Sequence, residues 1–190
     1  MIFILLGLLA FLLFYIYDIN SVLWNNTILR HSFFAGCLLF AVSAAGIIRD
    51  AYHICSPLSP LNKGALAVSA FFAALTIYTL FFALPFGKVY VHPGSGGRKV
   101  CRDGFYGLCR HPAVIWFILC FVFLEAALPA RECIIGGILF CAADVVYIII
   151  QDVWSFPVSF ADYDDYKKEV PFLKPTSASI HRCISTFRQI

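Results

Sequence analysis

The longest stretch of the chain without a charged residue runs over 64–87, and it limits the fold more than any other feature. A helix needs roughly 20 apolar residues to cross the hydrocarbon core of a bilayer, so this stretch is long enough to span one. The composition agrees: 61% of the 190 residues are hydrophobic and 13% are charged. Soluble domains have about 45–50% apolar and about 25% charged residues. We therefore predict an all-α integral membrane protein.

Four further apolar stretches complete a predicted five-span bundle, so that 1–190 forms a single membrane domain. They cover about 2–19, 32–48, 112–128 and 133–150. The second is rich in small residues, such as Gly36, Ser43 and Gly46, which let membrane helices approach closely. The first has no basic segment before it and no small-residue cleavage site, so we expect a retained helix rather than a removed signal peptide.

The Lys and Arg residues in the loops predict which end of the bundle faces the cytoplasm. The loop 88–111 holds five of them against one acidic residue, and the tail after Gln151 holds another five. Five spans put that loop and the tail on the same side, which we expect to be cytoplasmic. The N-terminus and the loop 49–63 then lie on the other side of the membrane.

The tail predicts a cytoplasmic amphipathic helix. Apolar and aromatic residues recur there at helical spacing before a proline ends the pattern: Phe160, Tyr163, Tyr166 and Val170, then Pro171. Two placements are open at this point. The helix either lies on the membrane surface with Lys167 and Lys168 facing anionic lipid, or folds back over the mouth of the bundle.

A basic segment over 102–112 leads directly into the fourth predicted span. Pro112 suits the first turn of a helix, because its locked φ fits and its missing N–H is not needed there. The unpaired N–H groups of a helix start favour an anionic ligand group, and Arg110 and His111 add a fixed charge and a titratable ring. The segment predicts a cationic site at the cytoplasmic mouth of the bundle.

Polar residues also follow one face of the fifth span toward the same end. Asp144, Tyr147 and Gln151 stand at i, i+3 and i+7, and Asp152 lies beside that face. Asp144 either takes part in function or hydrogen-bonds a neighbouring helix. Gln151 and Asp152 either contribute to the cationic site or mark the membrane interface.

Together these segments resemble the integral membrane methyltransferases typified by isoprenylcysteine carboxyl methyltransferase and phospholipid methyltransferase. The resemblance covers roughly 84–175. It rests on the pattern Gly104-x-Tyr106-x-x-x-Arg110-His111-Pro112, on Gln151 and Asp152 where the family has a carboxylate pair, on Phe160-Ala161, on the spaced Tyr163 and Tyr166, and on Val170-Pro171 followed by Pro175.

The resemblance implies S-adenosyl-L-methionine as methyl donor and a lipophilic acceptor that is isoprenylcysteine-like or phospholipid-like and arrives from the bilayer. The donor would bind from the cytoplasm to 88–112 and 151–175. The residues that bind the donor would be Gly104, Tyr106, Leu108, Arg110, His111, Pro112, Gln151, Asp152 and Tyr163. Arg110 suits the carboxylate of the donor and Asp152 its amine or ribose hydroxyls, which makes both candidates for a catalytic role. We expect no nucleic-acid partner, and the sequence specifies neither the acceptor nor the oligomeric state.

Three departures from the family pattern keep other functions open. Val114 and Trp116 stand where the family commonly has Tyr and Gly, and Gln151 cannot act as a base. The second candidate is an NADPH-dependent reductase of the sterol or steroid kind, whose sequences also carry Arg-His-Pro, and the third is a non-catalytic membrane protein that kept the fold. His92, Cys101, Cys109 and His111 match no common zinc spacing, so we expect no metal.

Overall fold

The computed structural model describes residues 1–83 and 99–187, and its regular elements there are helices. Five of them form the bundle: α1 (Ile2–Ile19), α2 (Ser32–Cys55), α3 (Pro60–Phe81), α6 (Pro112–Ala127) and α7 (Arg131–Ile150). Four short helices stand at one end of it: α5 (Phe105–Leu108), α8 (Phe156–Ser159), α9 (Tyr163–Glu169) and α10 (Ser177–Phe187). π-helical turns extend α1 over Asn20–Trp24 and α7 over Gln151–Ser155.

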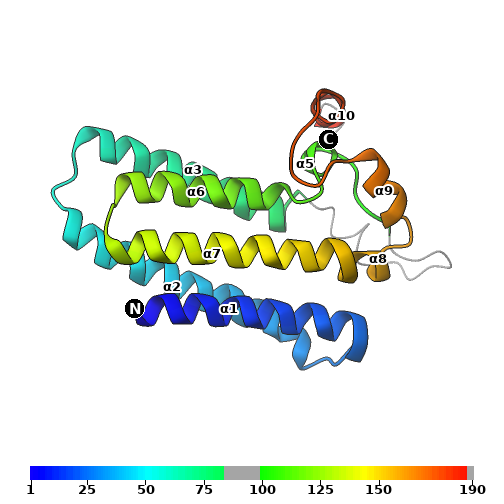
Figure 1. Ribbon diagram of the computed structural model, residues 1–190, viewed down its shortest axis with the longest axis horizontal. Coiled ribbons are helices and arrows are strands. Elements are labelled where there is room, and N and C mark those ends of the chain that lie inside the picture. The colour runs from blue at the N-terminus through cyan, green and yellow to red at the C-terminus, as the bar shows by residue number, and fades with distance from the viewer. Residues whose placement is uncertain (84–98, 188–190) are drawn as a thin grey trace.

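Helix α7 lies between two helix pairs (Figure 1). The pair α1–α2 packs on one side of α7 and the pair α3–α6 on the other, with α6 against α7. The N-terminus lies at one end of the bundle, while the segment that enters α6 and the tail after α7 lie at the other end (Figure 1). This arrangement brings the basic segment and the tail together, as the predicted topology requires.

In the part of the chain that the structure describes, four helices are long and apolar enough to cross a membrane, which marks the chain as a membrane protein. They run over Ile2–Trp24, Leu29–Cys55, Pro60–Phe81 and Arg131–Ser159. The fourth predicted span, 112–128, corresponds to α6, which has 16 residues. A helix of that length is about 24 Å long, less than the roughly 30 Å of a hydrocarbon core. The fifth crossing and the side of the membrane stay predictions.

The predicted loop 49–63 is wrong over most of its length. Helix α2 continues to Cys55, and Arg49 and Asp50 form an exposed ion pair of 2.8 Å on it. Helix α3 then begins at Pro60, because the Ser59 hydroxyl accepts a hydrogen bond from the backbone N–H of Asn62 at 3.2 Å. A charged turn can extend a membrane helix past the hydrocarbon core, which a rule based on apolar runs misses. Of the predicted span 64–87, residues 84–87 lie outside the described residues.

Small residues on α2 allow the close α1–α2 contact that the sequence predicts. Gly36 faces the ring of Phe14, and Gly46 faces the ring of Phe3. Ser43 is fully buried, and its hydroxyl donates to the carbonyl oxygen of Phe3 at 2.6 Å. Lipid is as apolar as the helix surfaces, so close packing and such interhelical hydrogen bonds, rather than burial of apolar area, hold the pair together.

Candidate functional site

The carboxylate of Asp152 is the centre of a charged cluster at the end of α7. It lies in the π-helical turn that follows α7 and is buried. Arg110, from the segment that enters α6, places Nε 2.9 Å from Oδ1 and donates from Nη2 to Oδ2 at 3.3 Å. The Nε–H group is not aligned for a hydrogen bond, so that contact is an ion pair held by proximity. Residues 42 positions apart in the sequence thereby form one nearly buried pair.

Tyr163 and Lys167 of α9 complete the cluster. The Tyr163 hydroxyl donates to Asp152 Oδ1 at 2.7 Å. Burial and the neighbouring carboxylate hold the pKa of Tyr163 above its ordinary value, so the hydroxyl keeps its proton and acts as a donor. Lys167 Nζ lies 3.8 Å from Asp152 Oδ2 and 5.3 Å from the centre of the Tyr163 ring. One carboxylate thus faces two permanent cations.

His111 lies beside the carboxylate in an aromatic setting. Its ring stacks on Phe156 at 5.7 Å between centroids and meets the ring of Phe172 edge-on at 5.3 Å. Its Nε2 is 3.5 Å from Asp152 Oδ1 and has no hydrogen-bond partner among the described residues. Burial lowers the pKa of His111, and the nearby Asp152 carboxylate offsets only part of that effect. His111 is therefore neutral at pH 7.

Backbone contacts hold the tail against the entry to α6. The backbone N–H of Arg110 donates to the carbonyl of Pro171 at 3.0 Å, and Arg110 Nη1 donates to the carbonyls of Lys167 and Val170 at 3.2 and 3.4 Å. Arg102 adds ion pairs of 3.0 Å to Asp162 and 2.9 Å to Glu169. The structure thus places α9 against the segment that enters α6.

Four of the predicted site residues make contacts elsewhere. Gly104 donates its backbone N–H to the hydroxyl of Thr186 in α10 at 2.8 Å. The Tyr106 hydroxyl donates to the carbonyl of Thr79 in α3 at 3.0 Å, and the Tyr106 carbonyl accepts from Tyr166 at 2.7 Å. Leu108 ends α5 and is half-buried. The contacts of Gly104 and Tyr106 support the segment that carries Arg110, while Pro112 begins α6 as predicted.

The fourth, Gln151, belongs to a polar contact between α7 and α1. Gln151 Nε2 donates to Asp18 Oδ2 at 2.9 Å, and Tyr147 lies within electrostatic range of the same carboxylate. The polar stripe predicted on α7 therefore reaches the expected end of the bundle but faces α1. Asp144, half-buried on α7, lies within electrostatic range of Tyr15 and Tyr147. Sequence reasoning missed Asp18, although it is the one charged residue of the first span.

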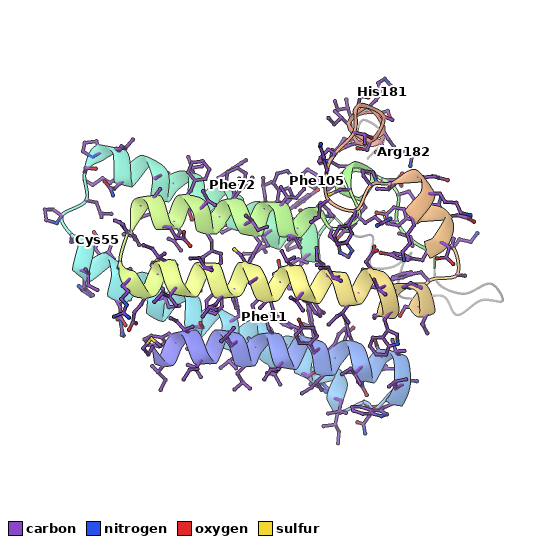
Figure 2. The ribbon with its side chains drawn as sticks, in the orientation of Figure 1. Phe11, Cys55, Phe72, Phe105, His181 and Arg182 are labelled. Carbon is purple, nitrogen blue, oxygen red and sulfur yellow. The ribbon has the colours of Figure 1, made fainter. Side chains whose placement is uncertain are left out.

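Trp116, the largest departure from the family pattern, fills the contact between α6 and its neighbours. Its ring stacks on Phe72 of α3 at 6.2 Å and meets Phe105 of α5 at 5.5 Å. Val114 is buried on α6. Figure 2 shows Phe72 and Phe105 on the α3–α6 side of the molecule, with Phe105 nearer the end where the tail gathers.

No protein-family model, curated protein or solved structure matches this chain. Within 1–83 and 99–187, no group of three or more His, Cys, Asp and Glu residues is placed to hold a metal ion. His92 and the part of the predicted cofactor region over 88–98 lie outside the described residues.

Proposed function

We propose that this chain is an integral membrane methyltransferase that uses S-adenosyl-L-methionine and acts on a lipophilic acceptor. The observation that carries the proposal is the Asp152 carboxylate, which lies between Arg110 and Lys167 in the turn that follows α7. Neighbouring fixed charges of both signs suit a zwitterion, because each end of the ligand meets an opposite charge. The methionyl end of the donor is such a zwitterion, with one carboxylate and one ammonium group.

The residues of the cluster fit that group. Arg110 and Lys167 would hold the carboxylate and Asp152 the ammonium, so that the ligand replaces part of the internal ion pairing rather than leaving charges unpaired. Tyr163 keeps its proton and orients Asp152 through the hydrogen bond at 2.7 Å. Neutral His111 offers a buried ring nitrogen without a partner in the described part of the chain. When bound, the donor supplies an activated methyl group on a sulfonium sulfur.

The role left to the protein is alignment and exclusion of water. Methyl transfer is an in-line displacement, and positioning of the two reactants accounts for much of the rate enhancement in such reactions. The folded-back tail supports this role, because Tyr163, Tyr166 and Val170 form a small apolar core directly over the charged cluster. An acceptor carried in the bilayer would reach that end of the bundle without passing through water.

The excess of positive charge around Asp152 is also compatible with one alternative function. The cationic side chains of Arg110 and Lys167 face one carboxylate. An NADPH-dependent reductase would need cations of this kind to bind the anionic phosphates of its cofactor. The position of Asp152 favours the methyltransferase, because a carboxylate buried between the cations repels a phosphate group and attracts an ammonium group. A non-catalytic membrane protein would need neither ligand.

Calorimetric titration of the detergent-purified chain with S-adenosyl-L-methionine and, separately, NADPH tests the proposal. We expect binding of S-adenosyl-L-methionine that Lys167→Gln weakens by about tenfold, the loss of one charged contact. Lys167 is partly exposed, so this variant is expected to fold. The control is Arg49→Gln, which breaks an exposed ion pair on α2. Binding of NADPH alone would favour the reductase, and binding of neither ligand would reject both enzymes.

A further inference from the structure

Helix α10 is fastened to the segment that leads to Arg110. Its Thr186 hydroxyl accepts from the Gly104 backbone N–H at 2.8 Å, and its Phe187 ring meets Phe105 edge-on at 4.9 Å. Arg182 on another side of the helix pairs with Glu169 of α9 at 3.2 Å. Ser179 and Cys183 are the buried residues of α10. The helix is therefore an integral part of the fold at this end of the bundle.

An apolar face of α10 has no cover in the described part of the chain. Ile180 is 44% exposed, Ile184 is 54% exposed and Phe187 is 38% exposed. Residues at i, i+4 and i+7 fall on one side of a helix, so these three form a continuous stripe, which we call the α10 apolar face. Its three residues lie about 140–160° around the helix from Arg182, at 100° per residue.

The orientation of α10 differs from that of the bundle. Figure 1 shows the long helices lengthwise and α10 almost end-on, at the end of the bundle where the tail gathers. If α1, α2, α3 and α7 cross the bilayer, α10 lies in the plane of the membrane. Arg182 faces α9, which stands beyond the end of the bundle, so the α10 apolar face on the opposite side is turned back toward the level of the spans.

A row of aromatic rings fixes the depth of α10. The ring of Tyr78 near the end of α3 meets Phe105 at 6.2 Å, and Phe105 meets Phe187 of α10 at 4.9 Å. Tyr78 and Phe82 are exposed at this end of α3, by 42% and 70%. Exposed aromatic residues at the end of a span are typical of the membrane–water interface. The ring of Phe105 therefore links the exposed aromatic end of α3 to the apolar face of α10.

We propose that α10 is an in-plane interfacial helix whose apolar face rests in the boundary between lipid headgroups and acyl chains of the bilayer that the spans cross. A helix with one apolar and one polar side is the form that lies in this boundary. The polar side, with His181, Arg182 and Ser185, then faces water. Because α10 binds Gly104 and Glu169, the bilayer surface supports the segment between Arg102 and Arg110. This inference stands whether or not the chain is a methyltransferase.

Tryptophan scanning of the full chain in nanodiscs tests the proposal. Ile184→Trp and the adjacent Ser185→Trp are compared in lipid brominated near the headgroup end of the acyl chains, with the signal of the three native tryptophans subtracted. We expect quenching of the new tryptophan to be about twofold stronger at 184 than at 185, because an interfacial helix buries one side by only about 5–10 Å. Both positions are exposed, and Ile180→Trp replaces Ile184→Trp if the latter unfolds.

Each other result would overturn the proposal. Equal quenching at both positions would mean that α10 has no preferred side toward the lipid. Absence of quenching at both would mean that the helix stands off the membrane, or that a second copy of the chain or another protein covers the face. Since no ligand is added, failure of S-adenosyl-L-methionine to bind has no bearing on this experiment.

Discussion

Replacing Asp152 by Asn tests whether the carboxylate compensates the buried charge of Arg110. The side chains of Arg110 and Asp152 are 12% and 10% exposed, so the guanidinium has little water to replace a lost partner. Removing one member of a buried ion pair costs about 3–5 kcal/mol. We expect the lower end, about 3 kcal/mol, because Arg110 Nη1 keeps the carbonyls of Lys167 and Val170. The amide oxygen of Asn still accepts from Tyr163.

The assay is SDS-induced unfolding of the purified chain in mixed micelles, which gives the free energy of unfolding. A double-mutant cycle with Arg110→Gln isolates the coupling between the two side chains. The matched control is Asp165→Asn, because Asp165 also pairs with a cation, Lys168 at 2.8 Å, but on an exposed surface. We expect no measurable loss for the control. Wild-type stability in Asp152→Asn, or zero coupling in the cycle, would show that the cluster does not hold the tail in place.

Two further perturbations follow from the same region. Burial lowers the pKa of His111 below the ordinary value of about 6.5, so His111 takes up a proton more readily in the unfolded chain than in the folded one. The folded protein should therefore lose stability as the pH falls below about 6.5. Thermal unfolding between pH 5 and 8 should show this loss of stability. The variant His111→Phe keeps a ring against Phe156 and should reduce the loss. An unchanged pH profile of the variant would contradict a buried neutral imidazole. Gly104 has φ +57°, so Gly104→Ala should lower the free energy of unfolding by about 1–3 kcal/mol. Gly64→Ala, where no atom lies within 4 Å of the added methyl group, should raise it by about 0.5–1 kcal/mol, and equal effects of the two changes would refute the backbone argument.

The sequence predicts those features of the fold that depend on a single helix. The uncharged length of 64–87 predicts a membrane helix, and the small residues of 32–48 predict its close neighbour. Pro112 marks the start of α6, which places Arg110 and His111 at that helix start. The helix end at Cys55 is not readable in this way. The charged Arg49 and Asp50 predict the end of a span at residue 48, whereas helix formation does not stop at the hydrocarbon boundary.

Tertiary structure alone decided which side chains meet. Gln151 and Asp152 are adjacent in the sequence, yet Gln151 contacts Asp18 of α1 while Asp152 contacts Arg110. Neighbouring residues on a helix point about 100° apart, and α7 lies between two helix pairs, so the rotation of α7 sends each side chain to a different partner. That rotation results from the packing of α7 against α1, α2 and α6, and no pattern within residues 133–155 contains it.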